Sequence, residues 1–398
     1  MNEQNEARAT RMSAGDLAQP ILAGILAATV GYASTFTLVL AGLGHMGASP
    51  SGAASGLMAM CLSLGVLNGV IVWRMRVPLS FAWSTPGAAF MLTLGPIEGG
   101  FPAVTGAFIA VAAMVVATGA IRPLSRAVAA IPQAVAAAML AGVLLPLCLA
   151  PVTAVAEIPA LALPVVAVWV LGLYFARRYA VPLAVVVAVV ALVFTSGEAA
   201  SHIVLAPPLL SFVMPVFSLD ALIKVAVPLY VITMASQNLT GIAVMRANGF
   251  DIDPRWPLIE TGLASAVVAL FGGLTINLAA LTAAIAAGPE AHPDPARRWV
   301  APVAAAATYT ALAFIATLAA AFIAASPPVL IQAVAGLALL PSLGGALAGA
   351  LASEDARLPA IVTFVTTASG ITLLGIGGAF WGLIAGIALM LLLVRERR

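Results

Sequence analysis

The residues of this sequence that could bind a ligand are neutral polar side chains set inside long apolar stretches. They are Tyr32, the pair Ser84 and Thr85, the pair Gln237 and Asn238, and Asn277. The acidic residues fall towards the ends of these stretches, so we expect no carboxylate at the centre of one. A carboxylate there would repel an anion, whereas amide and hydroxyl groups can donate hydrogen bonds to it. The pattern therefore favours a site for a small carboxylate with apolar parts.

Several of these side chains also have a purely structural interpretation. Ser34 and Thr35, which follow Tyr32 closely, can bond to carbonyls of their own helix. Tyr32 can be a core residue, and Asn277 can cap a helix. The adjacent amides of Gln237 and Asn238 are harder to explain in this way, because burying polar groups without hydrogen bonds is costly.

Composition assigns the chain to the membrane proteins. Hydrophobic residues make up 63% of the sequence and charged residues 8%, with a mean hydropathy of +1.12. A soluble globular protein has about 25% charged residues. We therefore expect a multi-pass membrane protein with no nucleic-acid partner. The polar first twenty residues argue against a signal peptide, and two cysteines inside apolar runs argue against a disulfide framework.

Gly, Pro and the rare charged residues divide the chain into fourteen expected membrane segments. When the segments alternate in direction, all sixteen arginines fall on one side of the membrane. Since basic residues are retained in cytoplasmic loops, both termini are expected in the cytoplasm. Lys224, the one lysine, is expected to pair with Asp220 one turn earlier. The segments lie near 20–41, 52–73, 79–95, 101–120, 130–149, 161–176, 180–196, 221–246, 257–271, 273–288, 298–323, 328–350, 357–370 and 375–394.

The third and tenth segments are not ordinary helices. Pro86, after two polar residues, fits poorly into a continuous spanning helix. We expect a strand at Leu79–Trp83 followed by a helix from about Ser84 to Gly95, and likewise a strand at Leu274–Asn277 followed by a helix from Leu278. Extended backbone inside a membrane must have its amides bonded within the protein, so the two strands could pair antiparallel. The alternative at either place is a kinked but continuous helix.

These broken segments occupy the third position in each half of a seven-plus-seven arrangement, and the two halves have opposite orientations. Interrupted segments at corresponding places of inverted halves indicate the binding site of a transporter. Each half-helix would begin near the midplane with unpaired N–H groups and a partial positive charge. The expected binding positions around these two starts are Ser84, Thr85, Pro86 and Gly87 in the first half, and Asn277, Leu278 and Ala279 in the second.

Motifs for other chemistry are missing or weak. The sequence has no HExxH, GxSxG or Walker A pattern, so we expect neither an enzyme nor an ATP-driven pump. The stretch PEAHPDPARRW (289–299) contains Glu290, His292 and Asp294, but its prolines fit a loop better than a metal site. We expect no metal and no cofactor.

Two stretches carry a resemblance to a known family: PLSFAWSTPGAAF (78–90) and FGGLTINLAALTAAIAAGPEAHPDPARRW (271–299). They resemble the benzoate/proton symporter (BenE) family of bacterial inner-membrane carriers. The resemblance implies a seven-plus-seven inverted repeat like that of nucleobase and SLC26-type carriers. It also implies a core domain at 20–120 and 220–323, a gate domain at 121–219 and 324–398, and a cytoplasmic tail at 1–19.

The function that this resemblance implies is import of benzoate, or a related aromatic carboxylate, together with a proton. Related nucleobase carriers have acidic residues near the places where this chain has Gln237 and Asn277, which argues against a nucleobase substrate. The departure leaves open which group carries the proton, with Glu260 and Glu290 as peripheral candidates. A nucleobase or inorganic-anion carrier of the same fold is the alternative, an uncoupled channel is a more distant one, and the chain could be a monomer or a homodimer.

Overall fold

The computed structural model describes residues 14–123, 132–195, 209–289, 291–373 and 376–396. Helices follow the apolar stretches, because a helix bonds its own backbone groups where no water can. The longer helices are α2 (Ala14–His45), α3 (Pro50–Val66), α6 (Gly100–Ala120), α8 (Gln133–Glu157), α9 (Pro159–Phe175), α10 (Ala180–Thr195), α14 (Arg255–Ala269), α16 (Val300–Ala313), α17 (Ala316–Ala325), α18 (Pro328–Leu351), α19 (Arg357–Ala368) and α20 (Gly378–Glu396).

Shorter elements interrupt or extend these helices. Three of them are π-helical turns, a rare form that often marks functional sites. They are η1 (Leu67–Ile71), η4 (Leu222–Ala226) and η5 (Met234–Asn238). The turn η1 joins α3 to α4 (Val72–Met75). The turns η4 and η5 join α11 (Leu219–Ala221), α12 (Val227–Thr233) and α13 (Leu239–Ala247) into one helical run. The remaining short elements are α5 (Thr85–Met91), α15 (Ala280–Ala287), η2 (Arg177–Tyr179), η6 (Pro295–Arg297), and the strands β1 (Phe81–Trp83), β2 (Ile276–Leu278), β3 (Thr372–Leu373) and β4 (Ile376–Gly377).

Within the described ranges, six helical runs are long and apolar enough to cross a bilayer. They are Leu17–His45, Pro50–Met75, Gly100–Ala120, Gln133–Glu157, Leu219–Arg246 and Pro328–Leu351. A seventh candidate is the pair α16 and α17, which is bent by 61° at its break. Each of the fourteen expected segments coincides with one or more helical elements, preceded by a strand in the third and tenth. Several of these elements are too short to cross a bilayer alone.

The third and tenth segments are broken as the sequence predicts. The strands β1 and β2 pair antiparallel, with Ala82 opposite Asn277 at the centre of the pair. The helix α5 follows β1 and the helix α15 follows β2, so the alternative of a continuous kinked helix is wrong at both places.

The boundaries of these elements differ from the prediction. The first half-helix ends at Met91 instead of Gly95, because Thr93 bonds back to the carbonyl of Phe90 and the chain turns there. Leu278, expected as the first residue of the second half-helix, belongs to the strand. The side chain of Asn238 accepts a hydrogen bond from its N–H, and α15 begins only at Ala280.

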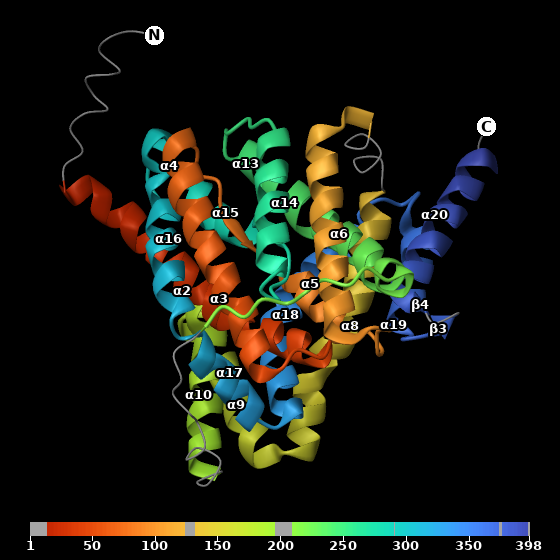
Figure 1. Cartoon of the computed structure of the whole chain (residues 1–398), viewed down its shortest axis with the longest axis horizontal. Helices are drawn as coiled ribbons and strands as arrows, with labels where there is room; N and C mark the ends of the chain where they lie inside the picture. Colours follow the sequence, from red (N-terminus) through yellow and green to blue (C-terminus); the bar gives the residue numbers. More distant parts are fainter. Residues whose placement is uncertain (1–13, 124–131, 196–208, 290, 374–375, 397–398) are drawn as a thin grey trace.

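Helix packing joins elements that are distant in the sequence. In Figure 1, α8 and α18 lie together, as do α6 and α14, and α2 and α16. A side chain at Gly336 of α18 would lie 2.1 Å from the carbonyl oxygen of Leu147 in α8, so the backbones touch there.

The predicted pair of Lys224 and Asp220 is present, with 2.5 Å between nitrogen and oxygen.

Both described ends of the chain point to the same side of the molecule. The end of α20 and the short helix α4, which carries Arg74, lie at the top in Figure 1, while α10 and α17 lie at the bottom. The helix α2 begins at Ala14, so residues 14–19, expected in the N-terminal tail, are already helical.

Candidate functional site

A two-stranded sheet positions the two half-helices relative to each other. Beyond the three strand pairs, the N–H of Ser84 donates to the carbonyl of Thr275 (3.0 Å), and the N–H of Ala279 donates to that of Ser80 (2.9 Å). Ser84 and Ala279 are the N-cap residues of α5 and α15. The half-helices therefore start at opposite ends of one small sheet and run away from it in opposite directions.

Side chains from neighbouring helices satisfy the outer edges of this sheet. On β1, the amide of Asn68 accepts from the N–H of Phe81 (3.0 Å) and donates to its carbonyl (3.1 Å). On β2, the hydroxyl of Ser265 accepts from the N–H of Ile276 (2.8 Å) and donates to its carbonyl (3.1 Å). These bonds give the buried N–H and carbonyl groups at the sheet edges the hydrogen-bond partners that buried backbone groups need.

The π-helical turn η5, which lies between α12 and α13, carries the two predicted amides, Gln237 and Asn238. The oxygen of the Asn238 side chain accepts from the N–H of Leu278 (3.0 Å), and its nitrogen contacts the sulfur of Met234 (3.3 Å). Asn238 is fully buried, so it fastens η5 to β2. Gln237 is partly exposed, and its amide has no hydrogen-bond partner among the described residues. Of the two amides, Asn238 is thus the one bonded within the described part of the chain.

Ser84 caps the first half-helix and ties it to α12. Its hydroxyl accepts from the N–H of Gly87 (3.1 Å) and lies 2.8 Å from the hydroxyl of Thr233. Thr85, Pro86 and Gly87 form the first turn of α5, where proline has no N–H to leave unpaired. A side chain at Gly87 would lie 2.6 Å from Leu229, so this turn packs directly on α12.

Asn277 connects the two strands and does not cap α15. With its amide oriented by the surrounding donors and acceptors, its oxygen accepts from the N–H of Ser84 (3.1 Å). Its nitrogen donates to the carbonyls of Ala82 (3.3 Å) and Leu278 (3.0 Å). The N-cap of α15 is Ala279, whose side chain offers no bond, so the alternative in which Asn277 caps this helix is wrong.

An aromatic cluster covers one side of the sheet. The Tyr32 ring stacks on Phe36 (5.3 Å between centroids) and meets Trp83 edge-on (5.9 Å), and Trp83 in turn meets Tyr309 of α16 (6.1 Å). The indole N–H of Trp83 donates to Thr35. The buried hydroxyl of Tyr32 has no partner within the described part of the chain. Ser34 and Thr35 bond to their own helix, at Val30 and Gly31, as their structural interpretation predicts.

Most predicted positions thus lie on or beside the sheet of β1 and β2. The sequence analysis missed several residues that contact this sheet or its half-helices. Ser84, Asn238, Asn277, Leu278 and Ala279 are joined by hydrogen bonds through the strands, while Tyr32 and Gln237 approach without such bonds. For one of the missed residues, Asn68, the sequence contained a signal, because it is a lone amide in an apolar segment. The missed residues are Asn68, Ser80, Thr233, Ser265, Thr282 and Tyr309.

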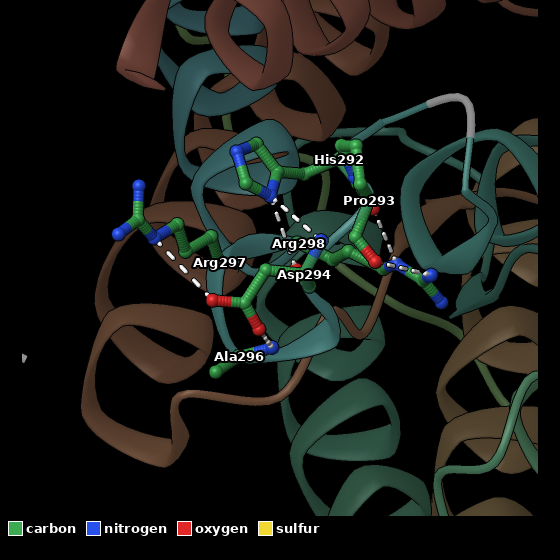
Figure 2. Close-up of polar contacts among 6 residues, drawn as sticks. All are labelled: His292, Pro293, Asp294, Ala296, Arg297 and Arg298. Carbon is green, nitrogen blue, oxygen red and sulfur yellow. Dashed lines mark hydrogen bonds and ion pairs between the residues drawn. The ribbon is translucent and has the colours of Figure 1, made fainter. Parts of the chain in front are cut away.

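The loop after α15 is organised by a buried arginine. Figure 2 shows Arg298 reaching back to the loop carbonyls of His292 (2.8 Å) and Pro293 (3.3 Å), to which it donates. It also donates to the carbonyl of Ala287 (2.7 Å). Ala287 is the last residue of α15, so a positive charge sits at the negative end of that helix dipole. In the part of the chain that the structure describes, no group of three or more His, Cys, Asp or Glu side chains could hold a metal.

Comparison with known proteins decides the family. The family model described as BenE, benzoate membrane transport protein, matches residues 16–392. The chain belongs to the BenE family. This is a family of membrane transport proteins, and its members are not enzymes. The BenE chain is 38% identical over 372 residues to the inner membrane protein YdcO of Escherichia coli, with 92% of this chain and 93% of that protein covered.

A second BenE relative is the benzoate membrane transport protein of Acinetobacter baylyi, which is 28% identical over 379 residues and covers 94% of this chain and 95% of its own. Solved structures show the fold. The transmembrane domain of a cyanobacterial bicarbonate transporter, BicA, matches 95% of this chain and 99% of its own, with a TM-score of 0.60 and 16% identity. SLC26A9 matches 95% of this chain and 66% of its own, with a TM-score of 0.63 and 13% identity. The BenE chain is therefore a largely helical membrane transporter with an SLC26-like fold.

Proposed function

We propose that this BenE protein imports benzoate, or a related aromatic carboxylate, by proton symport across a bacterial inner membrane. Membership of the benzoate membrane transport family carries the proposal, together with the name of the Acinetobacter relative. The inner-membrane location is supported by the name of the Escherichia coli relative. The proposed topology has fourteen membrane segments in two inverted halves, and both termini lie in the cytoplasm.

The substrate site lies beside the sheet, where the two half-helices begin. Its carboxylate is held by other N–H groups in the first turns of α5 and α15, since those of Ser84, Gly87, Leu278 and Ala279 bond within the protein. The Gln237 amide, which has no partner among the described residues, also holds it. The ring lies against the apolar surface that includes Phe36 and Trp83. The neutral hydrogen-bonding groups already described support an anionic substrate, because none of them brings a negative charge to the site.

Equivalent bonding in the two halves supports the inverted repeat. The central pair of the sheet is Ala82 and Asn277, and Phe81 and Ile276 directly precede these two residues. In each case one side chain of the preceding helical run bonds both the N–H and the carbonyl: Asn68 for Phe81, and Ser265 for Ile276. A two-fold axis through that central pair would exchange the strands. Seven segments in each half would place the halves in opposite orientations.

Alternating access occurs between a core domain at 20–120 and 220–323 and a gate domain at 121–219 and 324–398. Packing supports this division, because α8 lies mainly on α18 and α19, while α2, α3 and α6 lie mainly on α16, α17 and α14. The core carries the sheet and the substrate. Its movement against α8 and α18 exposes the site to each side of the membrane in turn.

The decisive experiment is uptake of radiolabelled benzoate by proteoliposomes, with and without an inward proton gradient. We expect uptake that the gradient stimulates and a protonophore abolishes. Benzoic acid crosses lipid by itself, so protein-free liposomes are the control. Uptake no greater than in this control would reject benzoate as the substrate.

Competition in the same vesicles separates the alternative substrates. Unlabelled aromatic carboxylates should inhibit the uptake of labelled benzoate, whereas uracil and bicarbonate should not. Inhibition by a nucleobase or by an inorganic anion alone would reassign the site to that class.

A further inference from the structure

A narrow crevice lies between α2, α15 and α16, beside the sheet and on the side of the aromatic cluster. Most of its wall consists of small apolar residues, among them Ala27, Ala286 and Ala305. Its empty space, open mouth included, is about 250 Å³, and its enclosed part has room for about one water molecule. Water can enter such a space when polar partners are present, but an aromatic ring cannot.

Three hydroxyl side chains line the crevice: Ser80, Thr282 and Tyr309. The oxygens of Ser80 and Thr282 are 2.6 Å apart, so one hydroxyl donates to the other. The same Ser80 accepts, through its carbonyl, the N–H of Ala279, which is the N-cap of α15. The hydroxyl pair therefore lies one helical turn from the half-helix start at which the carboxylate is proposed to bind.

The crevice extends from these hydroxyls along two helices. It follows α15 from Thr282 to Ala286 and α16 back from Tyr309 to Ala301. Both helices end, in this direction, at the loop held by Arg298, which the arginine distribution assigns to the cytoplasm. The crevice thus extends from the region of the substrate site towards the proposed cytoplasmic side.

We infer that this crevice is the route by which the symported proton leaves for the cytoplasm, an inference that rests on the proposed function. The substrate acid gives its proton to a water molecule or to the Ser80 and Thr282 pair and remains as the carboxylate. Each hydroxyl accepts a proton on its oxygen and releases its own to the next oxygen, so it ends unchanged. The last water passes the proton to the cytoplasm, and no carboxylate side chain is needed.

The first test separates proton movement from substrate binding. Thr282→Val removes a hydroxyl while keeping the shape of the side chain. Net benzoate uptake driven by a proton gradient should fall at least about tenfold. Benzoate exchange, in which labelled and unlabelled substrate swap without net proton movement, should change less than about twofold. Equal loss of both activities, or loss of neither, would overturn the inference.

Thr310→Val is the matched control, because Thr310 lies on α16 next to Tyr309 and, within the described part of the chain, its hydroxyl bonds only to its own helix at Ala306. It should leave both activities unchanged. Wild-type protein that performs neither uptake nor exchange would reject the proposed function, and the next measurement would still decide whether the crevice holds water.

The second test measures water in the crevice directly and needs no transport. Cysteine is introduced at Ala305, which lines the crevice, or at Ala307, which faces outward on the same helix, in a background without Cys61 and Cys148. Ag⁺, an ion of nearly the size of water, is added from the cytoplasmic side, and free thiols are alkylated after denaturation. Protection of Ala305→Cys but not of Ala307→Cys is expected. No protection at Ala305→Cys, or equal protection at both, would contradict a water-filled route.

Discussion

Asn68 and Ser265 hold opposite edges of one two-stranded sheet through the same pair of bonds. Each side chain accepts from a strand N–H and donates to the carbonyl of the same residue, which is Phe81 for Asn68 and Ile276 for Ser265. An amide and a hydroxyl can do this equally well, because both groups donate and accept. The sheet is therefore closed at both edges by side chains from the helices that precede its strands.

Replacing Asn68 by Ala should destabilise the protein strongly. It leaves the buried N–H and carbonyl of Phe81 without partners, and each such loss costs about 1–3 kcal/mol. We expect a lower thermal unfolding temperature of the detergent-solubilised protein. The control is Asn248→Ala, since among the described residues the Asn248 side chain bonds only to its own helix end, at Val244. Equal unfolding temperatures of the two variants would show that the strand edge does not depend on Asn68.

The hydrogen bond between Ser84 and Thr233 should make their substitutions non-additive. Ser84→Ala removes both this bond and the N-cap of α5. Loss of the N-cap alone costs about 1 kcal/mol of stability. Thr233→Val removes the bond alone. A double-mutant cycle on unfolding free energy should give a coupling of about 0.5–1.5 kcal/mol, within the range for residues in contact. Strict additivity would show that the pair contributes nothing to stability.

Gln237→Ala should weaken substrate binding without affecting folding. One lost hydrogen bond to a charged carboxylate corresponds to about 1.5 kcal/mol, or a KM for benzoate raised roughly tenfold. The unfolding temperature should stay within error, because the Gln237 amide bonds to no other described residue. Gln133→Ala, at the exposed start of α8, is the matched control. Unchanged uptake kinetics would remove Gln237 from the site.

Arg298→Lys should be as damaging as Arg298→Ala, although it keeps the charge. A guanidinium donates to three carbonyls at once in a fixed fork, which an ammonium on a flexible stem cannot reproduce. Loss of one or two charge-assisted bonds costs about 1.5–3 kcal/mol each and should appear as a lower unfolding temperature. The neighbouring Arg297→Lys should have little effect, since Arg297 forms a partly exposed pair with Asp294 (3.4 Å). Wild-type stability of the Arg298→Lys variant would show that the fork geometry is irrelevant.

The sequence was sufficient to predict the broken segments and their pairing. In the third segment a proline after two polar residues excludes an ordinary spanning helix, and the tenth follows the same pattern of a strand and a half-helix. The sequence also located Ser84, Asn277 and Asn238 correctly beside the sheet. It could not assign their partners. Asn277 bonds across to Ser84, 193 residues earlier in the chain, and no local pattern indicates such a contact.

Helix starts and ends were harder to predict for the same reason. The helix α15 begins at Ala280 because Asn238, on another helix, binds the N–H of Leu278 and keeps that residue extended. Local propensity of the run Leu278–Ala287 favours helix throughout, and tertiary contact overrides it. Asn68 and Tyr309 were missed because their importance depends on which strand residue they contact.

The pairing of β1 with β2 has a consequence for how the protein is made. Phe81–Trp83 is synthesised long before Ile276–Leu278, and a strand in lipid without a partner leaves polar backbone groups exposed at a cost of several kcal/mol. The first half of the chain therefore cannot complete its third segment by itself during insertion. A chain truncated before α14 would retain a membrane segment that has no stable conformation.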